Sequence, residues 1–137
     1  MPDSLTSMLS SYYDTVPYDS HPFPQTAPEH LETLAFLFGL DAPAPAKSRV
    51  LELGCAAGGN VIPLAARHPD ASVLGVDLSS VQVAQGVKAV EQAQLKNIEL
   101  RAANIADIDA SFGKFDYIIC HGVYSWVPGP VQDAILR

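Results

Sequence analysis

Apolar and polar positions follow two spacings along most of this chain. Short apolar runs bounded by turn-forming residues predict four strands, at residues 49–53, 72–76, 98–102 and 115–120. Apolar residues three or four apart predict helices between and after them, at residues 60–67, from 79 or 80 to about 93, and from 129 or 130 to 137. Strands that alternate with helices are typical of a parallel sheet with right-handed crossovers. The pattern therefore predicts an α/β fold that binds its ligand where the strands end.

The beginning of the chain does not share this alternation. Residues 1–25 are polar and rich in turn formers, and we interpret them as an N-terminal arm. Aromatic residues stand between prolines in this arm: Tyr12, Tyr13, Tyr18 and Phe23. Such an arm either packs its aromatic side chains on the domain or forms a lid over a pocket, and the pattern leaves both possibilities open.

A further helix is predicted between the arm and the first strand. Thr26 and Glu29 have the spacing of a capping box, with Thr26 as the N-cap, and Gly39 suits the end of the helix. Its apolar positions have helical spacing: Leu31, Leu34, Ala35, Leu37 and Phe38. We expect two parts in the chain, an arm and helix over residues 1–48 and a binding domain over residues 49–137.

Composition and charge exclude several classes of protein. The 137 residues suffice for one domain, and 48% apolar with 17% charged residues indicates a globular chain. A net charge of −7 with scattered Lys and Arg argues against a nucleic-acid partner. No apolar run approaches the roughly 18 residues of a membrane span, and the N-terminus lacks the pattern of a signal peptide.

Cys55 and Cys120 lie in apolar surroundings, as reduced thiols do. We predict a cytoplasmic protein without membrane or nucleic-acid partners and without a metal site.

The clearest candidate site lies at residues 49–60, where a strand, a Gly-rich turn and a helix start follow one another. Glycines let the backbone turn sharply and approach a ligand, and the helix start offers free N–H groups. The order is typical of a nucleotide-cofactor loop. Gly54, Ala56 and Gly59 also fit a degenerate dinucleotide fingerprint, with Asp77 near the distance of a ribose-binding acid.

Glu52 argues against a dinucleotide. It precedes Gly54 by two residues, at the mouth of the strand, where a dinucleotide places its pyrophosphate. Like charges about 4–6 Å apart in a poorly solvated cleft repel each other by kilocalories. S-adenosylmethionine has no phosphate and carries an ammonium and a sulfonium, so a carboxylate favours it. The alternative is that Glu52 caps nearby backbone N–H groups without any ligand.

The loop resembles motif I of the class I S-adenosylmethionine-dependent methyltransferases. Glu52, Gly54 and Gly58 match that motif, Ala56 stands where the family has a glycine, and residues 75–79 resemble the second motif. We expect Ala56 to be accommodated only at negative φ. The resemblance implies a Rossmann-like parallel sheet with the strand order 3-2-1-4. It also implies that the cofactor contacts Glu52, Gly54, Cys55, Ala56, Gly58, Asn60, Asp77, Leu78, Asn104, Ile105 and Cys120.

Several of these side chains have an implied role and an alternative. By resemblance Asp77 takes both ribose hydroxyls, although it is also placed to cap the second helix. Leu78 packs on the adenine ring. Asn104 accepts from the adenine amine through its carbonyl oxygen while Ile105 contributes its backbone N–H, or Asn104 is a simple turn residue. We expect Asp116, just before the fourth strand, to be structural.

The segment after the fourth strand and the arm are candidates for the acceptor side. His121 lies where a general base or substrate contact belongs, but it equally suits a bond to the cofactor or to the backbone. Tyr13 and Tyr18 are placed with it on the substrate side. Tyr124 and Trp126 wall a pocket or pack on the last helix, and we favour packing for Trp126.

Residues 13–18, 21–26, 54–60 and 121–128 together resemble bacterial methyltransferases that carry a methyltransferase-regulatory domain after the catalytic one. Relatives in that group include protein-lysine methyltransferases, so a protein lysine or a small molecule is implied as acceptor. The chain would then be the N-terminal part of a longer protein, with its fourth strand exposed as an edge where a homodimer could form. Two rival functions are a non-catalytic module that binds S-adenosylmethionine or S-adenosylhomocysteine, and an NAD-dependent oxidoreductase.

Overall fold

A parallel four-stranded sheet forms the centre of the protein. The computed structural model describes residues 2–16 and 18–137. Its strands are β1 (Arg49–Leu53), β2 (Ser72–Asp77), β3 (Ile98–Ala102) and β4 (Tyr117–Ile119). They lie in the order β3-β2-β1-β4, and every neighbouring pair is parallel. The predicted fold class and strand order are therefore confirmed.

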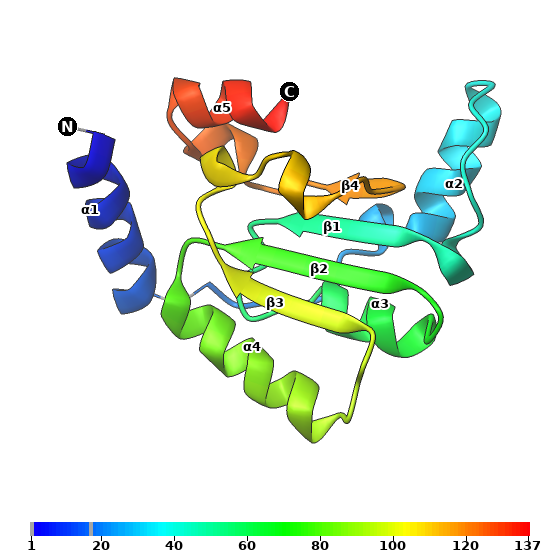
Figure 1. Ribbon diagram of the computed structural model, residues 1–137, viewed down its shortest axis with the longest axis horizontal. Helices are drawn as coiled ribbons and strands as arrows, with labels where there is room; N and C mark the ends of the chain where they lie inside the picture. Colours follow the sequence, from blue (N-terminus) through cyan, green and yellow to red (C-terminus); the bar gives the residue numbers. More distant parts are fainter. Residues whose placement is uncertain (1, 17) are drawn as a thin grey trace.

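Helices surround this sheet on its faces and at its ends (Figure 1). They are α1 (Pro2–Thr15), α2 (Pro28–Leu37), α3 (Val61–Arg67), α4 (Ser80–Gln92) and α5 (Gly129–Ile135). α1 lies beyond the carboxyl ends of the strands, and α2 lies at the other end of the sheet (Figure 1). Single-turn 3-10 helices complete the connections: η1 (Pro24–Thr26), η2 (Pro45–Lys47), η3 (Ile105–Asp107), η4 (Ala110–Phe112) and η5 (Tyr124–Trp126). Residues of α1, α5 and the carboxyl ends of the strands border one cavity.

Alternating side chains of the strands build two apolar cores. Val50 of β1 belongs to the first, with Val61 of α3 and Val83 of α4. Leu51 and Leu53 belong to the second, against η3, η4 and α5. Both faces of the central strands are therefore buried, which explains why β1 and β2 are almost continuously apolar. Glu52 is the exception in β1, since its carboxylate is buried in the sheet at 4% exposure.

The N-terminal region departs from the sequence prediction. Residues 2–15 form helix α1, where we expected a turn-rich arm. The irregular part of the arm is therefore shorter and leads from the end of α1 into η1.

The predicted capping box is wrong. α2 begins at Pro28, so its N-cap is Ala27, whose side chain has no oxygen that could accept from the N–H groups of the first turn. Thr26 instead ends η1, and its hydroxyl donates to the carbonyl oxygen of Phe23 (2.9 Å). Glu29 accepts from Arg67 (3.0 Å) and hydrogen-bonds His68 (2.9 Å). This ties α2 to the end of α3.

The end of α2 agrees with the prediction. Gly39 has a φ of +74°. Its N–H bonds to Phe36 (3.1 Å), and the N–H of Leu40 reaches back to Ala35 (2.8 Å). This is a Schellman motif, which glycine fits because it tolerates the left-handed conformation.

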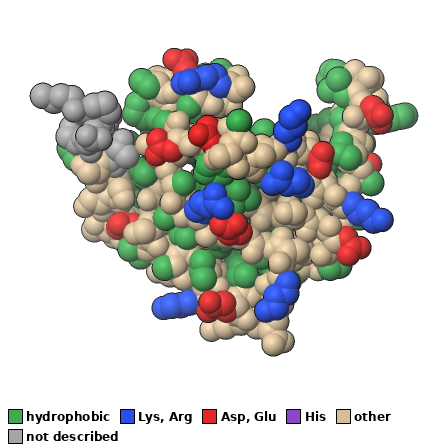
Figure 2. All heavy atoms as spheres, viewed as in Figure 1, with side chains coloured by type: hydrophobic (Ala, Val, Ile, Leu, Met, Phe, Trp, Pro, Cys, Tyr) green, Lys and Arg blue, Asp and Glu red, His purple; other side chains and the backbone are tan. Residues whose placement is uncertain are grey.

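The edge strand β4 and the end of α2 are among the surfaces that carry exposed apolar side chains. The edge strand β4 exposes 58% of Ile118, and only β1 pairs with this strand in the described sheet. The end of α2 exposes Phe36, Leu37 and Phe38, which gather at one tip of the molecule (Figure 2). Asp116 fixes the start of β4 by accepting from the N–H of Arg49 (2.7 Å), which confirms its structural role.

Candidate functional site

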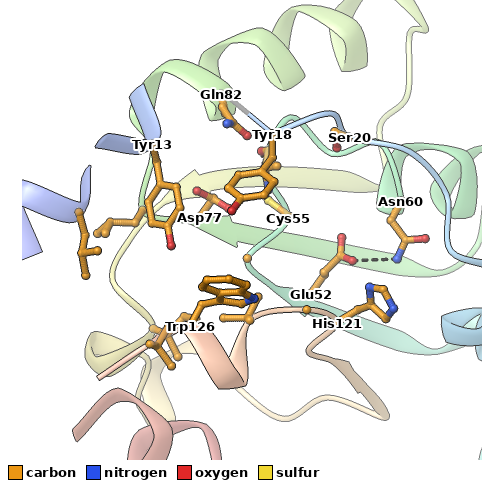
Figure 3. Close-up of a pocket in the computed structure, with 18 of the residues that line it drawn as sticks. Tyr13, Tyr18, Ser20, Glu52, Cys55, Asn60, Asp77, Gln82, His121 and Trp126 are labelled. Atoms are coloured by element: carbon orange, nitrogen blue, oxygen red, sulfur yellow. Dashed lines mark hydrogen bonds between the residues drawn. The ribbon is translucent and has the colours of Figure 1, made fainter. Parts of the chain in front are cut away.

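A cavity of about 340 Å³ opens at the carboxyl ends of the strands. Its walls come from α1, the arm, the loop after β1, the ends of β2 and β3, the segment after β4, and α5. Glu52 and Asp77 lie along it, with Tyr13 and Tyr18 on one side and Trp126 opposite (Figure 3). The cavity therefore unites the cofactor loop with the predicted substrate side.

The loop after β1 is tightly wound. Gly54 and Gly58 have φ values of +76° and +81°, and Ala56 has +50°. The expectation that Ala56 needs negative φ is therefore wrong. A left-handed conformation costs a non-glycine residue about 1–2 kcal/mol. It is held here because the N–H of Ala56 donates to Oδ2 of Asp77 (2.8 Å).

Gly58 and Gly59 serve packing. Gly58 lies outside the cavity lining, because it is buried against Ile62 and Leu100. A Cβ on Gly59 would overlap the backbone of Ser20 in the arm. The N–H of Gly59 donates to Oγ of that serine (2.7 Å). Because Gly59 has no side chain, the arm can pack directly against the backbone of the loop.

Glu52 is a buried carboxylate with one unused oxygen. Its Oε1 accepts from Nδ2 of Asn60 (2.8 Å), whereas Oε2 is buried without a hydrogen-bond partner. Burial raises the pKa of Glu52 from its ordinary 4.5 to about 7, the Asn60 bond lowers it, and the charge of Asp77 adds to the rise. No backbone N–H bond to this carboxylate occurs in the described part of the chain, so the capping alternative has no support. An unpartnered buried oxygen beside a cavity is a site for a donor or a cation.

Asp77 holds the loop and the start of α4 together. Its Oδ1 accepts from the N–H of Ser79 (2.9 Å), and its Oδ2 accepts from Ala56. The N-cap of α4 is Ser79, whose Oγ accepts from the N–H of Gln82 (3.2 Å). That hydroxyl also donates to Asp14 of α1 (2.5 Å). Asp77 is therefore free of the capping role, and its oxygens keep lone pairs toward the cavity.

The other predicted cofactor residues divide into two groups. Leu78, Asn104, Ile105 and the buried Cys55 line the cavity. Asn104 also makes the turn foreseen as its alternative role, because its Oδ1 accepts from the N–H of Ala106 (3.0 Å). Cys120 lies outside the lining, since it packs against the second core. Burial raises the pKa of both thiols, which keeps them protonated.

His121 is held by the arm. Its ring stacks on Phe23 at a centroid distance of 4.0 Å, and its Nε2 lies 3.1 Å from Nε2 of Gln25. The Gln25 amide donates to this nitrogen in the tautomer that carries the imidazole proton on Nδ1. His121 lines the cavity from the segment after β4. The structure thus brings it to the predicted substrate side through contacts that sequence spacing did not reveal.

Three aromatic side chains border the open part of the cavity. The rings of Tyr13 and Tyr18 lie 6.0 Å apart, and burial raises the pKa of Tyr13. Trp126 lies across from them (Figure 3) and is 70% exposed. The packing role that we favoured for Trp126 is therefore wrong. η5 presents its ring at the cavity rather than in a core.

Sequence reasoning missed part of the lining. Ser20 of the arm, Gln82 of α4 and Val131 of α5 border the cavity, and they join Phe23, one of the aromatic residues for which a lid role had been left open. Gln82 could have been noticed in the sequence, because it is a polar residue in the first turn of a helix face that is otherwise apolar. The structure buries this side chain at 3% exposure. No lysine or arginine lines the cavity among the described residues. Acidic and aromatic groups therefore dominate its chemistry.

This lining fits the predicted cofactor better than a dinucleotide. Glu52 offers an unpartnered oxygen, Asp77 lies at the next strand end, and the described lining has no cationic side chain to balance a pyrophosphate. A cationic ligand finds complementary charge there. In the described part of the chain, no cluster of His, Cys, Asp or Glu could hold a metal, and no helix is long and apolar enough to cross a membrane.

A parallel sheet ordered 3-2-1-4 with a Gly-rich loop and an acidic cavity at the strand ends defines a Rossmann-like nucleotide-cofactor fold, and the acidic lining favours a cationic cofactor. A family model described as "Methyltransferase domain" matches residues 50–137, and the chain belongs to this family.

Relatives from Rickettsia share most of the chain. Uncharacterized protein RP789 of Rickettsia prowazekii is 58% identical over 91% of this chain and 23% of its own length. Uncharacterized protein RP028 of the same organism is 48% identical over 91% of this chain and 50% of its own length. The structure of PKMT2 from Rickettsia typhi in complex with AdoHcy superimposes with a TM-score of 0.84 at 48% identity, covering 88% of this chain and 23% of that one. The chain thus spans a quarter to a half of these relatives.

Proposed function

We propose that this chain is the cofactor-binding part of an S-adenosylmethionine-dependent methyltransferase whose acceptor is an amine, with a protein lysine favoured over a small molecule. The observation that carries the proposal is the buried Glu52 carboxylate, with its free Oε2, at the strand end beside an acidic cavity. Membership of the methyltransferase domain family supports the cofactor, as does the AdoHcy bound by PKMT2. The cofactor is S-adenosylmethionine.

The bound cofactor supplies a methyl group on a cationic sulfonium. Glu52 binds the cationic end, since its free oxygen accepts a charge-assisted hydrogen bond. Asp77 binds the ribose hydroxyls with the lone pairs that its bonds to Ala56 and Ser79 leave unused. Leu78 packs on the adenine ring, Asn104 accepts from its amine, and Ile105 offers its backbone N–H. These residues position the methyl group, and positioning supplies much of the rate in such a displacement.

The aromatic border favours an amine acceptor. Tyr13, Tyr18 and Trp126 can hold an alkylammonium through their ring faces, and the acidic cavity attracts it. The ammonium must lose a proton before its nitrogen lone pair can attack. His121 lies on this side, and its Nε2 can take that proton, directly or through water, in place of the hydrogen bond that it accepts from Gln25.

The test has two stages. Calorimetry with S-adenosylhomocysteine and with NAD comes first, and preference for NAD would overturn the proposal. Transfer of a radiolabelled methyl group to lysine-containing peptides and to small amines comes second, with the whole protein and with this chain. Peptide labelling that disappears when lysine is replaced by arginine supports the proposed acceptor. Cofactor binding without labelling of any acceptor would point to a non-catalytic sensor.

Four finer features remain predictions. These are the methyltransferase-regulatory domain in the complete protein, the division at residue 48 into a lid and a binding domain, a cytoplasmic location, and a homodimer through the β4 edge. The exposure of Ile118 supports the last of these, since an open strand edge invites pairing.

A further inference from the structure

The side chain of Asn60 joins three segments that are far apart in the sequence. Its Nδ2 donates to Oε1 of Glu52 (2.8 Å) and to Oγ1 of Thr26 (3.0 Å). Its Oδ1 accepts from the N–H of Phe23 (2.9 Å). One amide thereby links the buried carboxylate of the cofactor loop, whose bond to Asn60 is seen in Figure 3, to two points of the arm.

Only an amide of this size satisfies all three partners. A carboxylate and a threonine oxygen require donors, and a backbone N–H requires an acceptor, so the amide can adopt only one orientation. Aspartate would retain the acceptor for Phe23 but lose both donors. Alanine would lose all three bonds. The bond to Glu52 and the two bonds to the arm therefore fix the orientation of the Asn60 amide together.

The arm that Asn60 holds also shapes the acceptor side. Phe23 stacks on His121, and Gln25 hydrogen-bonds the same imidazole. Ser20 accepts from the N–H of Gly59, next to Asn60. A shift of residues 20–26 would therefore move the ring that faces the acceptor.

We propose that Asn60 is a positioning residue that couples occupation of the cofactor site at Glu52 to docking of arm residues 20–26, and through Phe23 and Gln25 to the placement of His121. The inference rests on the proposed function. A cationic ligand at the free oxygen of Glu52 favours its ionised form, which strengthens the bond from Asn60 and fixes the amide. The fixed amide then presents its other donor to Thr26 and its oxygen to Phe23. Coupling of this kind is reciprocal, so loosening the arm weakens cofactor binding.

Thr26 gives the sharpest test, because it bonds Asn60 but does not line the cavity. We expect Thr26→Val to weaken the affinity for S-adenosylhomocysteine about 3- to 10-fold, as loss of a hydrogen bond in the coupled network would, and Thr26→Ser to restore it. Thr33→Val is the matched control. Thr33 is exposed on α2 and bonds only its own helix, at the carbonyl oxygen of Glu29 (2.8 Å), so its affinity should equal wild type.

Hydrogen exchange measures the coupling without activity. Saturating S-adenosylhomocysteine should slow amide exchange over residues 20–27 in the wild type and in Thr33→Val. In Asn60→Asp and Thr26→Val the same amides should exchange faster and respond little to the ligand. Methyl transfer by the whole protein should show a raised KM for the acceptor in Thr26→Val.

The outcomes separate this inference from the proposed function. Failure of the wild type to bind S-adenosylhomocysteine would overturn the proposed function. Binding by the wild type with unchanged affinity and exchange in Thr26→Val would overturn the coupling alone. An equal loss of affinity in Thr26→Ser and Thr26→Val would also overturn it, because the retained hydroxyl should preserve the bond.

Discussion

Replacing Glu52 with glutamine should make the protein more stable at alkaline pH while weakening its cofactor binding. Glu52 is 4% exposed, and its pKa is raised to about 7 from 4.5, mainly by burial. A raised folded-state pKa means that the folded protein prefers the protonated form. The resulting stability is fully present below about pH 4.5 and is lost as the pH rises through about 7.

The magnitude follows from this shift. One pKa unit corresponds to about 1.4 kcal/mol, so ionisation of Glu52 costs the fold about 3 kcal/mol above pH 7. Glutamine carries no charge and keeps an oxygen for Asn60, but it leaves an unpaired amide N–H where Oε2 lies, which costs about 1 kcal/mol. We therefore expect Glu52→Gln to raise the free energy of unfolding by about 2 kcal/mol at pH 8. The gain should vanish below about pH 5, where wild-type Glu52 is protonated.

Cofactor binding should change in the opposite direction. Loss of a charge-assisted bond of about 1.5–3 kcal/mol weakens binding roughly 10- to 150-fold. Wild-type affinity should also rise with pH between about 5.5 and 8 as Glu52 ionises, and Glu52→Gln should lack this dependence. Urea unfolding and calorimetry with S-adenosylhomocysteine at pH 5 and pH 8 measure both quantities. A variant that binds as tightly as wild type, or that gains no stability at pH 8, would refute the reasoning.

Further substitutions test the rest of the site. Ala56→Gly should stabilise the protein by about 0.5–1 kcal/mol, because the φ of +50° is unstrained only for glycine; a lower urea midpoint would contradict this. Asp77→Ala should weaken S-adenosylhomocysteine binding by about 1.5–3 kcal/mol. It should also lower the stability of the protein, because Asp77 holds the loop through Ala56, and Asp77→Asn should keep part of that stability. His121→Ala should slow methyl transfer at saturating cofactor and should weaken S-adenosylhomocysteine binding no more than Thr26→Val does, because it removes only contacts of the arm; a larger loss of affinity would place His121 in the cofactor site. Ile118→Lys should abolish any concentration-dependent dimer seen by light scattering, and a dimer that survives it would not use the β4 edge.

The strands and their helices could be predicted because their signals are local. β1 covers the residues of the predicted first strand, and β2 continues one residue beyond the predicted end of the second strand, to Asp77. Gly39 ends α2 as expected, since only its own backbone conformation matters there. α1 was missed because the serines and tyrosines and the threonine of residues 7–15 have weak helix propensity. Its last turn instead contacts α4 through Asp14 and Ser79, a contact that no local pattern reveals.

The conformation of Ala56 shows why the loop itself was only half predictable. Sequence alone suggested that an alanine needs negative φ at this position. The bond from its N–H to Asp77, which lies 21 residues further along the chain, holds the left-handed conformation. A distant partner thus outweighs a local preference of about 1–2 kcal/mol.

By itself the sequence determined the α/β fold, the strand order through its resemblance, and a cofactor loop with a carboxylate at Glu52. Each depends on residues close together in the chain, where apolar spacing, glycine and charge act over a few positions. Only the tertiary structure decided that Asn60 joins Glu52 to Thr26, that Phe23 stacks on His121, and that Trp126 faces the cavity. These contacts join residues as many as 98 positions apart, and it is the folding of the arm over the ends of the parallel strands that brings them into reach.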